Sequence, residues 1–372
     1  MSITIKQVKT KKDLKTYIFL PEKLHSKHKN WLYPIYSDER TFYSHKKNHT
    51  YSYSNTIMYL AYQDNKPVGR VMGIINKKYN DANNQKQGRF AFFESTDNKD
   101  VANALLAKVE NWAKENGMDH IIGPFGFSDK EPQGILIEGF DKPTVIVTNH
   151  SFPYLSSFVE SYGYEKKLDL VQYKLNIPDS IPDLYKRASA RALNNGYDIL
   201  EFDKRKNLKP LIYPVFKLLN DSYKNIFGFA PFLDKEIFEF ANRFIYLINP
   251  RFVKAAVDKD QNIIGFVIAM PDIGKGINMA KGRLFPFGLW HILRAGKKTK
   301  QLNLLLGAVK EEYRNHGIDI LMAVKLMESA KNEGMQFIDS HVVMESNKPM
   351  RAEMERLGAN IYKRYRIYQK QL

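Results

Sequence analysis

The sequence predicts an α/β protein of two tandem domains, each a twisted mixed β-sheet flanked by α-helices. Three observations predict this fold class, because each occurs once in either half of the chain and in the same order. They are a strand pair around a polar turn, a long amphipathic helix followed by a short strand, and an asparagine followed by a helix, a glycine and a final strand. The length of 372 residues also exceeds the roughly 100–200 residues of one ordinary domain.

The repeated strand pairs are runs of β-branched and aromatic residues on either side of a short polar turn, which is the sequence pattern of a β-hairpin. The strands of the first pair are expected at 57–62 and 68–74, and those of the second pair at 253–257 and 263–269.

The repeated helices are expected at 101–117 and 318–334, where apolar residues recur at spacings of three and four and therefore share one face. Gly334 supplies a stop signal at the end of the second helix. Short strands are expected directly afterwards, at 120–122 and 337–339.

The third repeat ends each half. Its parts are Asn149, helix 154–162, Gly163 and strand 168–175 in the first half, and Asn347, helix 350–357, Gly358 and strand 361–368 in the second. Paired positions keep nearly equal offsets except at the long helix, which requires insertions at 123–141 and 279–300. Pro178 and Pro182 interrupt regular structure, so the domains are expected at 1–177 and 178–372.

Composition limits the classes of function. The formal net charge of +17 favours anionic partners such as nucleotides, phosphorylated cofactors, nucleic acid or anionic lipid. The absence of cysteine excludes disulfides, thiolate nucleophiles, iron–sulfur clusters and thiolate zinc sites. Histidine pairs such as His25 with His28 and His45 with His49 lack carboxylates nearby in the sequence, so they are expected at the surface and no metal site is predicted. An export signal and a spanning apolar segment are not seen, so a cytoplasmic location is expected, with peripheral contact at the inner membrane as a variant.

With these motifs in place, each half resembles a GCN5-related N-acetyltransferase (GNAT) domain, and the pair is similar to the tandem arrangement of some bacterial acyltransferases. The resemblance implies that acyl-CoA binds where a central strand separates from its neighbour, with the pyrophosphate on the loop that opens the next helix. In the C-terminal half this strand is 304–309 and this loop is 314–319. The donor-binding residues that the resemblance implies are Gly307, Val309, Arg314, Asn315, His316, Gly317, Ile318, Asp319 and Asn347.

Physical chemistry supports this loop independently. A helix N-terminus offers unpaired N–H groups and a positive dipole end, Gly317 allows close approach, and Arg314 adds charge. Asp319 departs from the family pattern, which usually has glycine or alanine there, and a plain helix N-terminus is the alternative.

The corresponding stretch of the first half, 94–101, has no glycine, and its Asp97 and Asp100 would repel a phosphate. Capping of the following helix by Ser95, Thr96 or Asp97 is therefore expected. The N-terminal copy is predicted to be a degenerate partner that shapes the acceptor groove.

Acyl transfer from a thioester to an amine requires the amine to lose a proton and the leaving thiolate to gain one. Strand alternation places His341 and Glu345 on one face after the second long helix. Glu345 is the first candidate for the general base, directly or through a water, and His341 is the second, because a histidine pKa near 6.5 suits proton transfer. A structural histidine is the alternative for His341. Asn347 contacts the pantetheine arm, as the resemblance implies, or only caps the next helix, and both roles are compatible.

Many family members protonate the thiolate with a tyrosine, where this chain has Met354, and Val159 in the first copy. Either Tyr362, Tyr365 or water replaces it, or the domain binds CoA without turnover.

Both insertions have functional and structural interpretations. The first, 123–141, is rich in glycine, proline and charge and offers Ser128, Asp129, Glu131 and Glu138 as acceptor-site candidates, with a surface loop as the alternative. The second, 279–300, combines apolar and aromatic residues with lysines and arginines, and predicts a hydrophobic substrate pocket, an interfacial anchor or a packed helix with a solvated basic end.

The function predicted from these residues and the resemblance is an N-acyltransferase that moves an acyl group from acyl-CoA, or acyl carrier protein, to a primary amine. The apolar insertion at 279–300 favours a long acyl chain or an amphiphilic amine such as a sphingoid base, which some similar bacterial tandem proteins acylate. A polyamine, amino sugar or peptide amine fits equally well. The alternatives are a non-catalytic acyl-CoA-binding scaffold and a basic nucleic-acid-binding protein, although the basic residues are interleaved with acidic ones.

Overall fold

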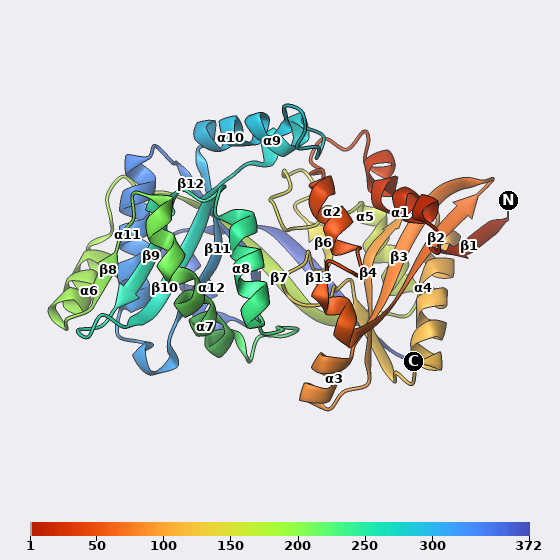
Figure 1. Cartoon of the computed structure of the whole chain (residues 1–372), viewed down its shortest axis with the longest axis horizontal. Helices are drawn as coiled ribbons and strands as arrows, with labels where there is room; N and C mark the ends of the chain where they lie inside the picture. Colours follow the sequence, from red (N-terminus) through yellow and green to blue (C-terminus); the bar gives the residue numbers. More distant parts are fainter. Residues whose placement is uncertain (1) are drawn as a thin grey trace.

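A computed structural model describes residues 2–372, and the side chains at all of these positions except 243 and 244. Its centre is one 13-stranded sheet in the order β1-β2-β3-β4-β5-β13-β7-β12-β11-β10-β9-β8, with β6 also paired to β13. Figure 1 shows the sheet running through both halves of the molecule, with helices on its two faces. The predicted α/β class with a mixed sheet in each half is confirmed.

The N-terminal half contains the following elements: β1 (Ile3–Gln7), α1 (Lys11–Leu24), α2 (Tyr36–Phe42), the 3-10 helix η1 (His49–Tyr53), β2 (Ser54–Gln63), β3 (Lys66–Asn76), α3 (Lys77–Asn83), β4 (Gln87–Ser95), α4 (Lys99–Glu115), β5 (His120–Gly123), β6 (Ile135–Glu138), α5 (Pro153–Ser161) and β7 (Glu165–Asn176).

The C-terminal half contains these elements: α6 (Asp183–Asn194), β8 (Asp198–Leu200), η2 (Arg205–Leu211), α7 (Ile212–Tyr223), α8 (Asp234–Phe244), η3 (Pro250–Phe252), β9 (Val253–Val257), β10 (Ile263–Pro271), α9 (Gly274–Met279), α10 (Gly288–Lys298), β11 (Gln301–Val309), η4 (Glu311–Tyr313), α11 (Ile318–Asn332), β12 (Phe337–Met344), α12 (Lys348–Arg356) and β13 (Asn360–Gln371).

The three repeated motifs occupy equivalent places in the two halves. The hairpins are β2–β3 and β9–β10, the long helices are α4 and α11, and the strands after them, β5 and β12, are parallel to β4 and β11. Helices α5 and α12 then lead into the final strands β7 and β13. The amphipathic helices bury their apolar faces on the sheet, as their periodicity predicts, with Leu105 of α4 and Leu321 of α11 fully buried.

The final strand of each half pairs with the sheet of the other half. Strand β7 pairs with β12, and β13 pairs with β5, while β7 and β13 also pair with each other. The two halves therefore share one continuous hydrogen-bonded sheet. Strand pairing between distant segments is set by tertiary structure, so the order of motifs along the chain did not reveal this exchange. The boundaries 1–177 and 178–372 stay a prediction.

One capping prediction is wrong. Helix α4 is capped by Asn98, whose side-chain oxygen accepts hydrogen bonds from the backbone N–H groups of Asp100 and Val101. Ser95 instead lies at the end of β4, fully buried, and donates its hydroxyl to the Thr96 carbonyl. Asparagine is as good an N-cap as serine or aspartate, so residue type alone did not decide between neighbouring candidates.

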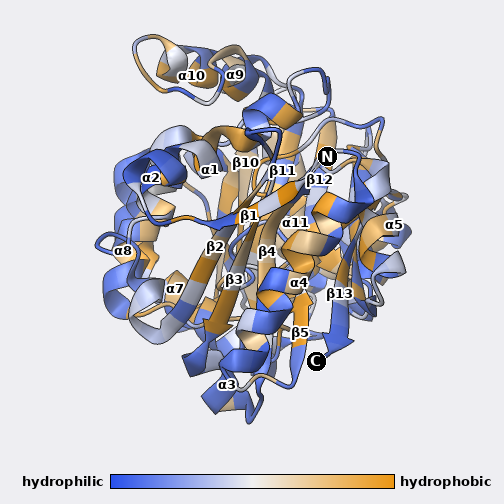
Figure 2. Ribbon diagram, turned by 90° about the vertical axis from the view of Figure 1, so that its right-hand side faces the viewer, coloured by the Kyte–Doolittle hydropathy of each residue, from blue (hydrophilic) through white to orange (hydrophobic). Residues whose placement is uncertain are grey.

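The segment that contains α9 and α10 stands apart from the layered body. Figure 2, in which the molecule is turned by 90°, shows both helices above the sheet and carrying hydrophobic and hydrophilic residues side by side. The apolar residues Ile277 and Ile292 attach these helices to the body by packing into one cluster with Met270 of β10 and with Val145 and Ile146 of the N-terminal half.

Candidate active site

The parallel strands β11 and β12 separate partway along their length. They pair from Gln301 with Phe337 to Asn303 with Asp339. Beyond this point β11 continues along β10, and β12 continues along β7. The register of β12 against β7 shifts between Asp339 and Val342, where His341 adopts a positive φ of 57°. This point of separation, here called the vertex, lies where the predicted donor strand leaves its neighbour.

The equivalent separation in the N-terminal half is crossed by its own loop. Strands β4 and β5 pair as far as Arg89 with Ile122, after which the Phe125 N–H donates to the Phe90 carbonyl at 2.9 Å. The fully buried guanidinium of Arg89 donates to the Phe127 carbonyl at 2.8 Å. Backbone groups of the loop and the Arg89 side chain of β4 thus bond to each other where these two strands separate.

Asp339 organises the polar residues at the vertex. Its fully buried carboxylate accepts hydrogen bonds from the Gln172 amide at 2.7 Å, from the His341 backbone N–H at 2.9 Å and from the Tyr362 hydroxyl. Burial and the neighbouring Asp339 raise the pKa of Tyr362, so this hydroxyl keeps its proton at neutral pH.

A buried lysine lies beside this carboxylate. Lys363 is fully buried, and its ammonium donates to the Pro143 carbonyl. Burial lowers the pKa of Lys363 to about 8, although Asp339 and Asp272 act in the opposite direction. Asp272, which follows β10, accepts a hydrogen bond from Asn303 at 3.3 Å, and burial raises the pKa of its carboxyl. The vertex therefore holds a lysine and a carboxyl whose pKa values burial shifts toward neutrality.

His341 bridges the two halves. Its Nε2 lies 3.0 Å from the carbonyl oxygen of Ile146, so Nε2 carries the proton and Nδ1 carries the lone pair of the neutral ring. Burial lowers the pKa of His341 below its usual 6.5. The imidazole is consequently neutral at physiological pH and competent as a base.

The N-terminal loop 143–150 covers the vertex. Its Pro143 and Ile146 carbonyls accept the hydrogen bonds from Lys363 and His341, and its Val145 side chain packs with Met270 of β10. The polar site is thus built from β12 and β13 on one side and from a loop of the other half on the second.

The same loop ends in a chain of three histidines. His150 Nε2 lies 2.9 Å from His28 Nε2, His28 Nδ1 lies 3.2 Å from His25 Nδ1, and His25 Nε2 lies 2.9 Å from a carboxylate oxygen of Glu94. His25 is 2% exposed and is stacked between Trp31 and Phe152. The prediction that His25 and His28 are surface residues without a carboxylate is therefore wrong, because Glu94 approaches His25 from a distant strand.

One set of tautomers satisfies every contact in this chain. If His25 donates to Glu94, then His28 donates to His25 and His150 donates to His28, which leaves the lone pair of His150 on Nδ1. Among the described residues, this buried Nδ1 has no hydrogen-bond partner. Burial lowers the pKa of His150 to about 3, and the nearby charge of Lys363 acts in the same direction.

The predicted donor-binding residues lie along β11 and in the loop after it. Arg314, Asn315 and His316 are exposed, and Gly317 has φ 79° immediately before α11, a conformation that glycine adopts without strain. Ile318 is buried in the core, Asp319 is exposed in the first turn of α11, and Val309 is half-buried. Asn347 caps α12 by accepting from the Met350 N–H at 3.3 Å, so its predicted capping role is confirmed.

Tyr223 of α7, which sequence reasoning missed, contacts the predicted donor strand. Its hydroxyl donates to the Gly307 carbonyl at 3.0 Å and lies 3.4 Å from the Gly307 N–H. Burial raises the pKa of Tyr223 to about 12. A tyrosine from α7 thus satisfies a backbone edge that β12 leaves unpaired.

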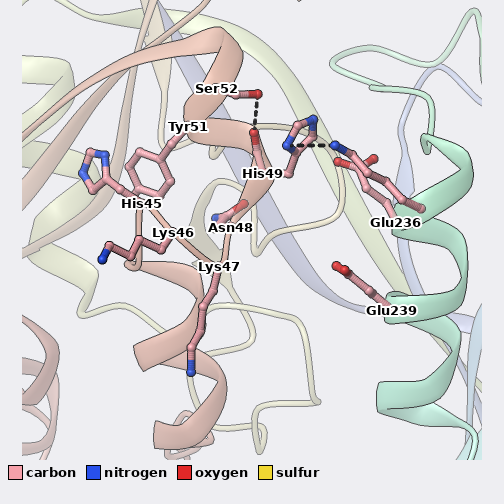
Figure 3. Close-up of a pocket in the computed structure, with 10 residues that line it drawn as sticks. His45, Lys46, Lys47, Asn48, His49, Tyr51, Ser52, Glu236 and Glu239 are labelled. Carbon is pink, nitrogen blue, oxygen red and sulfur yellow. Dashed lines mark hydrogen bonds between the residues drawn. The ribbon is translucent and has the colours of Figure 1, made fainter.

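A cavity of about 320 Å³ lies elsewhere, between η1 and α8, as Figure 3 shows. Its lining combines Lys46, Lys47 and Lys235 with Glu236 and Glu239. His45, predicted at the surface, is exposed and lies on its rim, while the ring of His49 contacts Lys235 at 3.3 Å. The cavity shares no residue with the vertex, so the enclosed volume and the buried polar groups of the vertex lie in different parts of the molecule.

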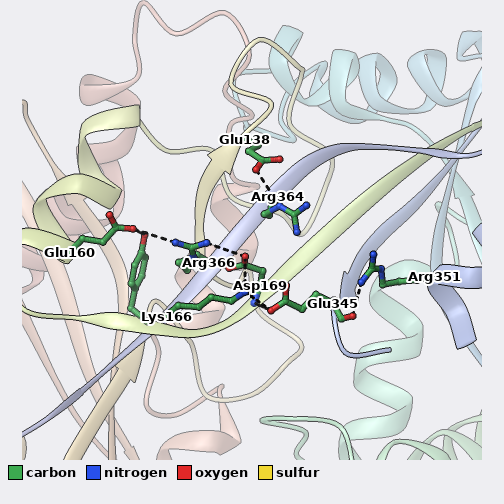
Figure 4. A network of polar contacts seen from close by, with 9 residues as sticks. Glu138, Glu160, Lys166, Asp169, Glu345, Arg351, Arg364 and Arg366 are labelled. Carbon is green, nitrogen blue, oxygen red and sulfur yellow. Dashed lines mark hydrogen bonds and ion pairs between the residues drawn. The ribbon is translucent and has the colours of Figure 1, made fainter. Parts of the chain in front are cut away.

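Glu345 belongs to an ion-pair network, shown in Figure 4. Its carboxylate lies 2.6 Å from Lys166 and accepts from the Asp169 N–H at 3.3 Å. Asp169 is itself bound by both nitrogens of the Arg366 fork at 2.8 and 3.1 Å. The register shift at His341 interrupts the alternation that was expected to align His341 with Glu345. The role of Glu345 as general base stays a prediction, and its ion pair with Lys166 makes His341 the better candidate.

The remaining candidates are distributed over both halves. Glu131 accepts from the Ser128 N–H at 2.8 Å, and burial raises the pKa of Glu131 to about 7 and that of Asp129 to about 6. Glu138 pairs with Arg364 of β13 at 3.3 Å. Met354 is buried in the core of the C-terminal half, whereas Tyr362 and Tyr365 reach the vertex residues Asp339 and Gln172.

Among the described residues, no group of three or more histidine, aspartate or glutamate side chains is arranged to hold a metal ion. In residues 2–372, no helix has the length and apolar character needed to cross a membrane.

No protein-family model matches the chain. Among curated proteins, it is similar to a bacterial ceramide synthase from Caulobacter vibrioides (strain NA1000 / CB15N), at 28% identity over 379 residues that cover 100% of this chain and 98% of the relative. It is also similar to protein YghO from Escherichia coli (strain K12), at 27% identity with 97% and 94% covered. Among solved structures, a tandem GNAT protein from the clavulanic acid biosynthesis pathway matches with a TM-score of 0.57 and 12% identity, over 100% of this chain and 98% of that one.

Proposed function

Because the chain has the tandem GNAT fold, we propose that it is an N-acyltransferase whose reaction takes place at the vertex of the C-terminal half. The observation that carries this proposal is the separation of β11 from β12 after Asn303 and Asp339, with the neutral imidazole of His341 at that point. A strand edge that β12 leaves, running from a helix N-terminus toward a partly buried imidazole, suits a thioester donor.

The substrate donor is acyl-CoA in this proposal, which the fold usually binds. Arg314 and the N–H groups around Gly317 bind its pyrophosphate, and the edge of β11 binds the pantetheine arm. The N-terminal split, filled by its own loop, takes no donor.

His341 removes a proton from the acceptor amine through Nδ1. The amine nitrogen then attacks the thioester carbon, the carbon–sulfur bond breaks, and the thiolate gains a proton, so that an acyl-CoA and an ammonium ion give an amide, free CoA and one proton. Water is the proposed acid, because burial and Asp339 raise the pKa of Tyr362 and make its hydroxyl a poor proton donor to a thiolate.

The acceptor class rests on the relatives. This chain aligns over nearly the whole length of a relative named as a ceramide synthase, and ceramides are N-acylated sphingoid bases. We therefore propose a long-chain acyl group and an amphiphilic amine of the sphingoid type.

The test measures thiol release and product mass together. Acetyl-CoA and palmitoyl-CoA are each incubated with sphinganine, spermidine or glucosamine, and released CoA is detected with a thiol-reactive dye, since the chain has no cysteine to react. Palmitoyl-CoA with sphinganine is expected to release thiol and form the amide.

Binding measured by calorimetry separates the alternatives. The double variant Arg314→Ala, Gly317→Glu is expected to lose CoA binding, with Lys331→Ala as a matched control at the far end of α11. CoA binding without release of thiol for any amine favours a non-catalytic scaffold. If thiol is released only when an acylated carrier protein is supplied, the donor is acyl carrier protein and not acyl-CoA.

A further inference from the structure

The segment 279–293 concentrates the exposed apolar surface of the molecule. Among the described residues, eleven large hydrophobic side chains are exposed, and six of them lie in this segment. These six are Met279 (65% exposed), Phe285 (90%), Phe287 (70%), Leu289 (49%), Trp290 (56%) and Leu293 (43%). Such clustering marks an interaction surface, because single exposed apolar residues are otherwise scattered.

The inner side of this segment is fixed to the body. Ile277 and Ile292 are 1% exposed, the Asn278 side chain bonds to the backbone of Trp31 and Tyr33, and Arg283 pairs with Glu22 at 3.0 Å. Because the inner side of the segment is bound to the body, its other side and the apolar residues on it face the solvent.

The charged residues of this part of the sequence have one sign. Between Asp272 and Glu311 the sequence contains eight lysines and arginines and no acidic residue. Arg294, Lys297 and Lys298 are exposed on the last turns of α10, and Arg294 lies over the Trp290 ring at 5.2 Å from its centroid. Apolar side chains beside basic ones match a bilayer with anionic headgroups, where the rings enter the acyl region and the cations remain at the phosphates.

We propose that the segment formed by α9 and α10 docks the protein on an anionic lipid bilayer. Phe285, Phe287 and Trp290 are 56–90% exposed on a segment that Figure 2 shows above the sheet, which favours insertion between lipids over binding of a second folded protein. The segment also packs with Ile146, whose carbonyl accepts the hydrogen bond from His341, so docking places the vertex next to the membrane surface.

The test is flotation of the purified full chain with vesicles of phosphatidylcholine containing 30% phosphatidylglycerol, and with pure phosphatidylcholine. The wild type is expected to float with the anionic vesicles and to be released by salt. The triple variant Phe285→Ser, Phe287→Ser, Trp290→Ser is expected to lose binding by about tenfold or more. The matched control is Tyr213→Ser, Phe238→Ser, Tyr246→Ser, which removes exposed apolar residues elsewhere and is expected to bind as the wild type.

A second measurement needs no multiple variant. The emission of Trp290, obtained by subtracting the spectrum of Trp290→Phe, is expected to shift to shorter wavelength with anionic vesicles. The proposal is overturned if the wild type does not float, if both triple variants bind equally, or if the segment instead mediates a dimer in solution that Phe285→Ser, Phe287→Ser, Trp290→Ser abolishes. Binding is measured without acyl donor or amine, so this result is independent of the proposed reaction.

Discussion

The imidazole Nε2 of His341 lies 3.0 Å from the carbonyl oxygen of Ile146, so a backbone atom of the N-terminal half fixes the tautomer of the proposed base in the C-terminal half. A site that uses this imidazole as its base therefore draws on both halves. A C-terminal half on its own would leave the ring without the acceptor that holds its lone pair on Nδ1.

The first prediction follows from that tautomer. His341→Gln keeps a hydrogen-bond donor toward Ile146 but removes the basic nitrogen, so kcat is expected to fall by about 100-fold or more with little change in donor affinity. The initial rate of amide formation at saturating substrate gives kcat, and calorimetry with CoA gives the donor affinity. His120→Gln, on a strand of the other half, is the control, and an unchanged kcat in His341→Gln would assign the base elsewhere, with Glu345→Gln as the next variant.

Tyr223→Phe is expected to strengthen donor binding. Its hydroxyl occupies the backbone edge of Gly307, where we propose that the pantetheine arm binds, and removing one such hydrogen bond is worth roughly 1 kcal/mol, or about fivefold in Kd. Calorimetry with CoA measures the change, and Tyr213→Phe on the exposed side of the same helix is the matched control. Weaker binding in Tyr223→Phe would mean that the hydroxyl contacts the donor and does not compete with it.

Arg366→Ala is expected to lower the free energy of unfolding by about 2–3 kcal/mol. It removes the two-nitrogen contact to Asp169, whose side chain is 4% exposed, and Lys166 compensates only in part. Burial alone would raise the pKa of Asp169, but the hydrogen bonds from Arg366 and Lys166 bring it below the ordinary value. Urea unfolding gives the difference.

The exposed pair of Arg356 with Glu353 supplies the comparison. Arg356→Ala is expected to change the free energy of unfolding by less than about 1 kcal/mol, because Arg356 is 52% exposed. Equal losses in both variants would contradict the expectation that the buried network of Figure 4 stabilises the contact between β7 and β13.

Acid is expected to destabilise the protein through His150. The folded pKa is about 3 and the unfolded value is near 6.5, so the unfolded chain binds the extra proton and stability falls as the pH drops from about 7 toward 3. His150→Gln does not titrate and is expected to show a shallower loss over this window. Unfolding at several pH values measures the slope, and identical slopes would place the acid sensitivity in other groups.

The sequence predicted the motifs with good accuracy because their signals are local. Helix α11 begins at Ile318 after Gly317, and the hairpin β9–β10 surrounds its polar turn, as periodicity and turn residues indicated. The separating strand was also predicted, since strand order and the family resemblance place it. By contrast, Lys363, Asp272, Gln172 and Tyr223 carried no local pattern, because ordinary strand and helix sequences contain them.

What the sequence determined by itself is the fold of each half, through apolar periodicity and turn chemistry that act over a few residues. Only the tertiary structure decided that β7 and β13 exchange between the halves and that Glu94 lies 2.9 Å from His25, 69 positions away. It also decided that a loop of one half covers the vertex of the other. These relationships depend on strand register and burial across long separations, where hydrogen bonding and desolvation act between residues that no local pattern connects.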